Sequence, residues 1–255
     1  MNLSHRLETT STEKAFDFDF ENDDTFISDF DSPVLPSIET NVDNSLGGLS
    51  NELLVNSTLL NNSSNSLSEL YDDPIEYGDP ITDAYYWRQQ EGSASCAVVA
   101  QISIYESLTG ERITESSASE VAHQQGWFNP VTGTPEEYVG YILEDLGINT
   151  FQMNDATLET LQYALSIGDK PIVGLDANEI WDPQYDSYGN PIEQENAGHA
   201  VWVTGIDYQI DGSVDIILND SGHPNGSASM VDYYDFMNAW QDYDYFATIA
   251  DNPCT

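Results

Sequence analysis

The 255-residue sequence predicts an α+β fold, carried by a domain over residues 79–255. Three observations support this fold class. Apolar residues recur at helical spacing in the first half of the range. Short runs rich in β-branched and aromatic residues fill the second half. Two of these runs are joined by a tight turn at Asp211 and Gly212, which indicates antiparallel neighbours. Helices first and antiparallel strands afterwards are typical of an α+β domain.

The expected helices lie in the first half of this domain, and each is bounded by a capping residue or a glycine. The clearest start is Thr134, because Pro135 and two glutamates follow in the first helical turn. Glycines mark the stops, since glycine readily takes the left-handed conformation that ends a helix. The four helices are expected over residues 96–108, 116–125, 135–146 and 157–167. The alternative caps are Thr114 or Ser116 for the second helix and Asp155 or Thr157 for the fourth.

The expected strands lie in the second half, where valine, isoleucine, threonine and aromatic residues alternate with turn signals. They cover residues 171–175, 200–206, 214–218 and 245–249. One short helix, over residues 231–240, interrupts them before the last strand. The sheet built from these segments is therefore expected to be mainly antiparallel.

The charge of the chain excludes two classes of partner. The sequence holds 45 acidic and 5 basic residues, a formal net charge of −40. Such a field repels phosphate backbones and anionic lipid, so we expect neither a nucleic-acid-binding nor a membrane-surface protein. No apolar run reaches the ~18 residues of a membrane helix, and the first ten residues lack the apolar core of a signal peptide. We expect a monomer, with the cytoplasm favoured and export without a leader left open.

Residues 1–78 differ from the rest of the chain in composition. They are acidic and rich in serine and asparagine, and their apolar residues follow neither a strand nor a helix period. A segment of this kind buries too little apolar surface to offset the entropy of ordering it, so we expect it to be mostly disordered. Only two cysteines occur, Cys96 and Cys254, which excludes a disulfide scaffold.

Cys96 is the first candidate for chemistry. A polar loop rich in glycine and serine, residues 89–95, runs directly into the apolar helix that begins at Cys96. The unpaired N–H groups and the positive dipole end of a helix stabilise a thiolate at such a position. A thiolate there could serve as a nucleophile. The alternative is a small buried thiol that only packs at the helix start.

Three further residues favour catalysis. Gln90 precedes Cys96 by six positions, so its amide could bend back and, with the Cys96 N–H, stabilise an oxyanion. His199 stands at the start of an apolar strand, where a general base would be held rigidly. Asp220 ends the next strand, and the turn between the two strands brings it beside His199, where it could fix the imidazole tautomer.

In the order Gln, Cys, His, Asp, the sequence resembles the papain-like cysteine peptidases, in particular the bacteriocin-processing branch that cuts after double glycine. The Gln90 to Cys96 spacing, the Gly-His strand start and the Asn-Asp-Ser-Gly strand end carry the resemblance, which covers about residues 83–250. It implies a two-lobed papain-like fold, and a hydrolase of peptide or isopeptide bonds that needs no cofactor. Cys96 would be the nucleophile, His199 the base, Asp220 its orienting partner and Gln90 the oxyanion donor.

Some features depart from this pattern or leave it open. Ser95 and Ala97 stand where bacteriocin-processing members usually carry Asp and Gly, which puts the substrate in doubt more than the chemistry. In papain itself the third residue is an asparagine, so the resemblance leaves Asn219 as a competitor of Asp220 for the orienting role. His223 is a rival base on a Gly/Pro-rich loop. Residues 181–196 fit a calcium loop only at Asp186 and Glu195, so we expect a loop that shapes specificity and no bound metal.

Two other functions stay open beside thiol-dependent hydrolysis of a peptide or protein substrate. The same residues can transfer an acyl group to an amine, as transglutaminases and peptide ligases do. Alternatively, the chain could be a non-catalytic module whose acidic tail binds a basic partner. Labelling of Cys96 by an electrophilic probe that depends on His199 separates the enzymes from the binding module.

Added salt is expected to stabilise the protein. With a net charge of −40, self-repulsion in the folded state is strong and is screened between ~0.01 and ~1 M ionic strength. The melting temperature should therefore rise with NaCl concentration in a thermal unfolding series. A flat or falling melting temperature would contradict this expectation.

Overall fold

A computed structural model describes residues 77–253, so almost all of the predicted tail, together with Cys254, lies outside the described residues. The described chain forms a seven-stranded sheet with the order β2-β7-β3-β4-β5-β6, in which β1 also pairs with β4. Every pairing is antiparallel. The strands are β1 (Tyr77–Gly78), β2 (Thr150–Met153), β3 (Lys170–Asp176), β4 (Gly198–Tyr208), β5 (Val214–Asn219), β6 (Ser229–Asp232) and β7 (Ala247–Ala250).

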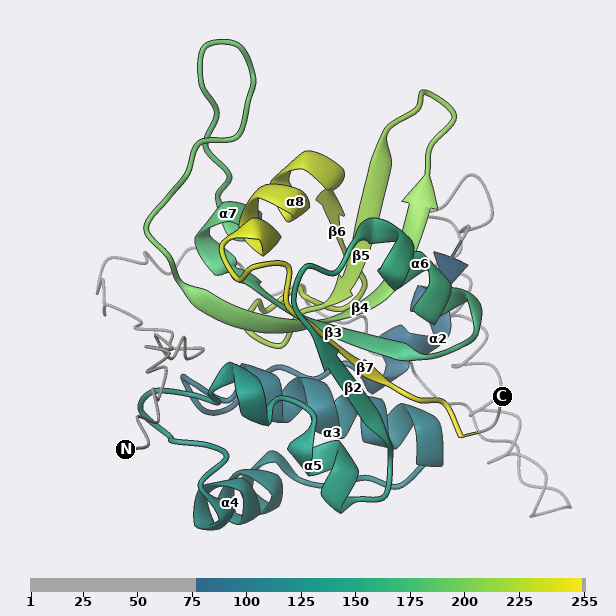
Figure 1. Cartoon of the computed structure of the whole chain (residues 1–255), viewed down its shortest axis with the longest axis vertical. Coiled ribbons are helices and arrows are strands. Elements are labelled where there is room, and N and C mark those ends of the chain that lie inside the picture. The colour runs from purple at the N-terminus through teal and green to yellow at the C-terminus, as the bar shows by residue number, and fades with distance from the viewer. Residues whose placement is uncertain (1–76, 254–255) are drawn as a thin grey trace, which may run out of the picture. The chain divides into compact units, whose positions relative to one another are not determined.

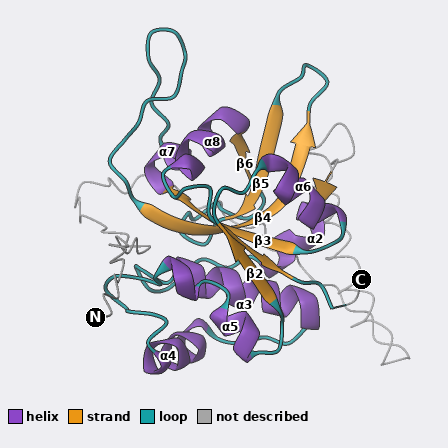
Figure 2. Cartoon of the chain, viewed as in Figure 1, coloured by secondary structure: helices purple, strands orange, loops and turns teal. Residues whose placement is uncertain are grey.

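Helices cover both faces of the sheet (Figure 1). α3, α4 and α5 lie on one side, and α6, α7 and α8 lie on the other, as the colouring by secondary structure also shows (Figure 2). The α-helices are α2 (Pro80–Asp83), α3 (Cys96–Thr109), α4 (Glu115–Gln125), α5 (Tyr141–Asp145), α6 (Leu158–Ser166), α7 (Ala177–Trp181) and α8 (Tyr233–Gln241), with 3-10 turns at Ala84–Tyr86 and Glu136–Tyr138. The mixture of helices with an antiparallel sheet confirms the α+β class.

Local capping chemistry explains the helices that the sequence predicts well. α3 runs from Cys96 and ends at Gly110, which takes the left-handed conformation with φ of 74°. α4 is capped by Thr114, whose hydroxyl accepts the backbone N–H of Ser117 at 3.2 Å. Thr157 caps α6 through a reciprocal pair of hydrogen bonds with Thr160.

The predicted helix over residues 135–146 is wrong as a continuous element. It breaks into a 3-10 turn and α5 at Gly140, which has φ of 112°. The buried amide oxygen of Gln101 on α3 accepts the N–H groups of Gly140 and Ile142, at 2.9 and 3.1 Å. A Cβ at Gly140 would lie 2.7 Å from Thr150 Oγ1, so only glycine fits. A tertiary hydrogen bond therefore overrides the local start signal.

Three strands were not predicted. β1 covers the last two residues of the predicted tail, which therefore belong to the sheet and pair with β4. β2 pairs with β7, which lies far along the chain, and β6 pairs with β5 just before α8 begins. β6 occupies the start of the helix expected over residues 231–240, which instead begins at Tyr233 with Asp232 as its cap. β7 begins later than predicted, because Asp244 and Tyr245 both have positive φ and form a turn. No helix among the described residues is long and apolar enough to span a bilayer.

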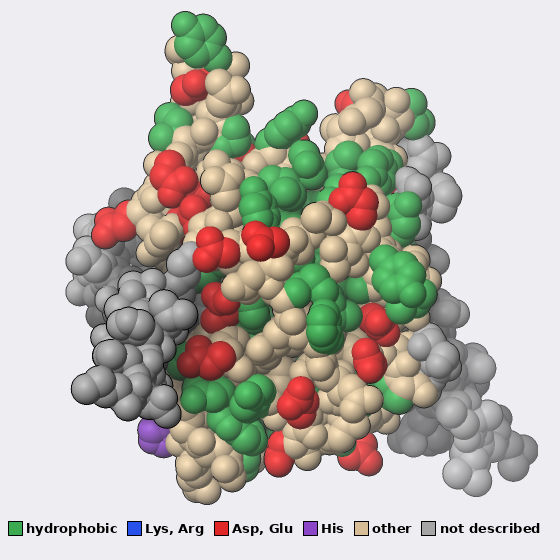
Figure 3. Space-filling model, in the orientation of Figure 1, with side chains coloured by type: hydrophobic (Ala, Val, Ile, Leu, Met, Phe, Trp, Pro, Cys, Tyr) green, Lys and Arg blue, Asp and Glu red, His purple; other side chains and the backbone are tan. Residues whose placement is uncertain are grey.

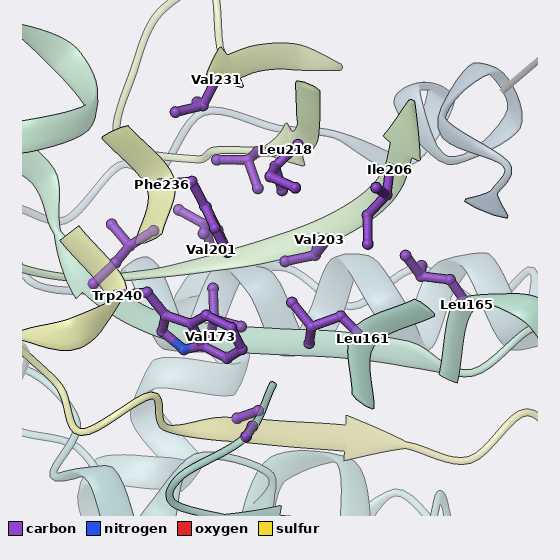
Figure 4. Close-up of a cluster of buried hydrophobic side chains, with 14 of the residues drawn as sticks. Leu161, Leu165, Val173, Val201, Val203, Ile206, Leu218, Val231, Phe236 and Trp240 are labelled. Atoms are coloured by element: carbon purple, nitrogen blue, oxygen red, sulfur yellow. The ribbon is translucent and has the colours of Figure 1, made fainter. Parts of the chain in front are cut away.

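Each face of the sheet packs its own apolar cluster. On the α3 side, Ala97, Ala100 and Ile104 contact Ala200 and Trp202 of β4. On the other side, side chains of α6 and α8 interdigitate with those of β3, β4 and β5 (Figure 4). Full burial of one large apolar side chain is worth about 1.5–3 kcal/mol, so β4, which is buried on both faces, is the best anchored strand. The residues labelled in Figure 4 are Leu161, Leu165, Val173, Val201, Val203, Ile206, Leu218, Val231, Phe236 and Trp240.

The outer surface of the described chain reflects its acidity. In the orientation of Figure 3, acidic side chains are spread over the visible face and no lysine or arginine of the described residues is seen. The cation Lys170 is instead drawn inward, where its ammonium lies 2.7 Å from the buried carboxylate of Asp83. Burial raises the pKa of Asp83 to about 6, in spite of the charge and hydrogen bond of Lys170, which lower it.

Candidate active site

Cys96 is the first residue of α3 and is 1% exposed. The backbone N–H groups of a first helical turn have no partner within the helix, so they are available at this end of α3. The preceding residue, Ser95, is also buried and does not cap the helix with its side chain. Its hydroxyl donates instead to Glu115 at 2.6 Å, on the neighbouring helix α4.

Glu115 organises the loop in front of Cys96, and the sequence analysis did not identify it. Its carboxylate accepts the backbone N–H groups of Glu91 and Gly92, at 2.8 and 2.9 Å, in addition to the Ser95 hydroxyl. The first residue of α4 thereby fixes the turn that delivers Cys96 to the helix start. In the sequence, Glu115 is only an acid that follows the cap Thr114 of α4. Its role could not be predicted, because its partners lie in the loop before α3.

His199 is the second residue of β4, where it lies opposite Leu175 of β3, and it is 1% exposed. Its Nε2 lies 2.6 Å from Asp220 Oδ1. Cys96 lies beside the same ring, close enough to act on its pKa through charge and hydrogen bonding. Because Asp220 occupies Nε2, the other ring nitrogen, Nδ1, is left for the thiol. The structure thus brings Cys96, His199 and Asp220 together.

Asp220 directly follows β5, and its carboxylate is fully engaged. Oδ1 accepts the Gly222 N–H at 2.8 Å in addition to the His199 contact, and Oδ2 accepts the indole N–H of Trp181 at 2.7 Å. Its backbone carbonyl accepts the indole N–H of Trp87 at 2.6 Å. A buried carboxylate that is satisfied in this way is held in a single orientation.

The buried pair is ionised because each partner stabilises the charge of the other. Burial alone would lower the pKa of His199, but the Asp220 charge and hydrogen bond, followed by those of Cys96, raise it to about 10. Burial would raise the pKa of Asp220, but His199 foremost, then Trp181 and Gly222, keep it below its ordinary value. The folded protein therefore holds the His199 proton more tightly than the unfolded chain does. The contribution of this proton to the free energy of unfolding is complete below about pH 6.5 and is lost as pH rises towards 10.

Gln90 lies in the same neighbourhood but is bonded to its own loop. Its amide nitrogen donates to the carbonyls of Gly92 and Ser93, at 2.9 and 3.3 Å. Its amide oxygen accepts the Ser221 hydroxyl at 3.1 Å, and its backbone N–H donates to the Ser221 carbonyl at 2.9 Å. Gln90 thereby ties the loop before Cys96 to the residue after Asp220. To donate to an oxyanion, the Gln90 side-chain amide would have to give up one of its two hydrogen bonds to the loop carbonyls.

The two alternative residues are held elsewhere. The amide of Asn219 donates to the Asp83 carbonyl at 2.8 Å and accepts the Ala228 N–H at 3.1 Å, so it braces the sheet edge. His223 is partly exposed on the loop after Asp220, and its Nδ1 accepts the Asn225 N–H at 3.2 Å. His199 is therefore hydrogen-bonded to Asp220, while the Asn219 side chain is bonded to Asp83 and Ala228.

Trp181 and Gly222 are further parts of the site that the sequence analysis missed. The Trp181 ring meets His199 edge to face, with centroids 5.3 Å apart, while its indole N–H holds Asp220. It also lies 6.0 Å from the His223 ring. A Cβ at Gly222 would lie 2.8 Å from His199 Cε1 and 2.9 Å from Trp181 Cζ2, so glycine permits this close packing.

One group of carboxylates among the described residues could hold a metal ion. Single oxygens of Asp176, Glu179 and Asp242 lie within 4.8 Å of one another. The two acids of the weak calcium pattern do not belong to this group. Asp186 accepts the N–H groups of Tyr188 and Asn190 within its own loop, which extends away from the sheet (Figure 1).

Comparison with known proteins assigns no reaction. The chain is similar to uncharacterised proteins of Mycobacterium bovis and Mycobacterium tuberculosis, each 29% identical over 192 residues, covering 64% of this chain and 79% of the relative. A crystal structure of a proposed C39-like peptidase from Bacillus anthracis aligns with a TM-score of 0.48 and 12% identity, over 65% of this chain and 93% of that one. No family model matches. The functional assignment therefore depends on the side chains described above.

Replacing Gly222 by alanine tests the packing of the site. The added methyl group would overlap the His199 and Trp181 rings, both of which are held by Asp220. Overpacking of this kind costs about 1–3 kcal/mol, so the free energy of unfolding of Gly222→Ala in urea should fall by about that amount. The exposed Asn225 on the same loop offers a control, and Asn225→Ala should change the free energy by less than about 0.5 kcal/mol. Equal stability of Gly222→Ala and the wild type would contradict this packing.

Proposed function

We propose that the protein is a thiol-dependent hydrolase of peptide or isopeptide bonds, with Cys96 as nucleophile. The observation that carries the proposal is the position of Cys96 at a helix start beside the ionised His199–Asp220 pair. A thiol, an imidazole and a carboxylate in this order are the parts that a thiol acyl-transfer enzyme needs. In the proposed resting state the Cys96 proton is held on His199, and Asp220 stabilises the imidazolium.

The arrangement of the chain also supports a papain-like, two-lobed description. Cys96 comes from the helical side of the molecule, where α3 packs with α4 and α5. His199 and Asp220 come from β4 and the end of β5, in the part of the sheet that α6 and α8 cover. The chemistry would then occur where the helical side meets the sheet, as the resemblance to papain-like enzymes implies.

In the acylation step, the Cys96 sulfur attacks the carbonyl carbon of the scissile amide and the carbonyl electrons move to oxygen. The Cys96 N–H and an exchanged Gln90 amide would donate hydrogen bonds to this oxyanion. His199 then gives its proton to the amide nitrogen, the carbon–nitrogen bond breaks, and a free amine leaves. The acyl group remains on Cys96 as a thioester.

In the deacylation step, water replaces the amine. His199, now neutral, removes a proton from the water as its oxygen attacks the thioester carbon. The carbon–sulfur bond breaks, a carboxylic acid is released, and the Cys96 sulfur leaves as a thiolate beside the protonated His199. An amine that reached the thioester before water would turn the same residues to acyl transfer.

Substitutions within the site should separate the roles. Measured as labelling by a peptidyl vinyl sulfone and as turnover of a peptide library by the full chain, Cys96→Ala should abolish both. His199→Ala should lower turnover about 10³-fold or more, since base and imidazolium vanish together. Gln90→Ala should lower turnover about 10²–10³-fold, because one oxyanion donor is lost. Asp220→Asn should cost less than His199→Ala, because an amide can still orient the ring. Asn219→Ala should lower turnover least, when turnover is normalised to the amount of folded protein.

His223→Ala is the matched control for the base. His223 is partly exposed, and its Nδ1 accepts a backbone N–H of its own loop, so the substitution should leave turnover near wild type. An inactive His223→Ala beside an active His199→Ala would overturn the assignment. Product masses with and without an added amine distinguish hydrolysis from transfer. Full probe labelling in the absence of His199 would favour a non-catalytic module with an incidental thiol.

A further inference from the structure

Three carboxylates from separate segments converge next to the candidate active site. Asp176 ends β3, Glu179 lies in α7, and Asp242 follows α8. One oxygen of each lies within 4.8 Å of the other two. Asp176 and Glu179 are 0% and 1% exposed, so their charges are removed from bulk water. Such burial is costly for an ionised group unless a partner compensates it.

The hydrogen bonds of these acids leave one oxygen of each buried residue unused. Asp176 Oδ1 accepts the N–H groups of Asn178 and Ala197, at 2.8 and 3.0 Å, and Glu179 Oε1 accepts the Gln194 N–H at 2.9 Å. Asp176 Oδ2 is buried and has no hydrogen-bond partner among the described residues. Glu179 Oε2 is also buried without a donor at hydrogen-bond distance, although the side-chain amide of Asn238 approaches the Glu179 carboxylate. A fully buried oxygen without a donor is rare in proteins and points to an additional ligand.

Asp176 and Glu179 form no ion pair with a lysine, arginine or histidine of the described residues. The charges that affect Asp176 and Glu179 are those of other acids, Glu193 among them. The charges of Glu179, Glu193 and Asp176 likewise act on Asp242. Glu193 is exposed on the loop between α7 and β4, and its charge acts on all three of these carboxylates. The field at this place is that of a cation site.

We propose that Asp176, Glu179 and Asp242 bind a divalent cation of the calcium type. All the donors are oxygens, which hard cations prefer, and calcium accepts irregular arrangements completed by backbone carbonyls and water. Magnesium needs a tighter and more regular octahedron, so it fits less well.

The cation would fasten the segments that surround the candidate active site. Asp176 pairs with Gly198, next to His199, and α7 ends in Trp181, which holds Asp220. Glu179 also holds the base of the loop over residues 182–197 through Gln194. Because each of the three acids comes from a different element, a cation bound by all of them would hold β3, α7 and the end of α8 together. Loss of hydrolysis on cation removal is a consequence that rests on the proposed function, whereas binding and stabilisation do not.

The test uses the full chain, freed of metal by chelation and held in 0.5 M NaCl so that its general acidity is screened. Calcium chloride is then titrated by isothermal calorimetry and in thermal melts, with magnesium chloride in parallel. We expect one saturable calcium site, a melting temperature that rises by several degrees, and a smaller magnesium response. An equal response to magnesium and calcium would overturn the calcium-type assignment.

Glu179→Gln removes one ligand charge while it keeps the oxygen that accepts the Gln194 N–H. Its calcium affinity should fall more than about tenfold, and in metal-free buffer it should be as stable as the wild type or more so, because a buried repulsion is relieved. Glu120→Gln, with the same charge change on the exposed face of α4, should keep the full calcium response. Equal calcium responses of the two variants, or a lower metal-free melting temperature of Glu179→Gln, would overturn the proposal. Asp242→Asn repeats the test should Glu179→Gln fail to fold.

Discussion

The ionised contact between His199 and Asp220 is the interaction on which the rest of the site depends. Two opposite charges are buried together, and each is tolerated only because the other is 2.6 Å away. A buried pair of this kind adds little net stability over an apolar pair, but loss of one partner leaves an uncompensated charge and is strongly unfavourable. The surrounding groups are arranged accordingly. Trp181 and Gly222 complete the hydrogen bonds of the carboxylate, and the Trp181 ring lies against the imidazole.

The fold supplies this contact through the pairing of two strands. β4 is buried on both faces and lies between β3 and β5, so His199 near its start has almost no freedom to move. β5 returns antiparallel and ends at Asn219, which places the next residue, Asp220, at the same edge of the sheet. α3 then brings Cys96 to that edge, and its loop is fixed from the side by Glu115. The residues with the chemistry thus come from rigid elements, as a preorganised site requires.

The sequence predicted those parts of the molecule that local chemistry determines. Helix ends at Thr114 and Thr157 depend on bonds within one turn, and the joined strands around Asp211 indicate which residues meet at their ends. The break at Gly140 could not be predicted, because it is imposed by Gln101 from another helix. β2 has too few residues to be identified without its partner β7. The roles of Trp181 and Glu115 could not be predicted either, because their partners lie far away in the sequence. The same holds for the group of carboxylates from β3, α7 and the end of α8.

The most direct test of the central contact is the protonation of His199, followed by ¹⁵N NMR of the imidazole in the full chain across pH 5–11, with His199→Gln used to assign the signal. The account predicts an imidazolium throughout neutral pH, with titration near the pKa of about 10 and a downward move of that pKa in Asp220→Asn. Titration of His199 near the ordinary value of 6.5, unchanged in Asp220→Asn, would contradict it.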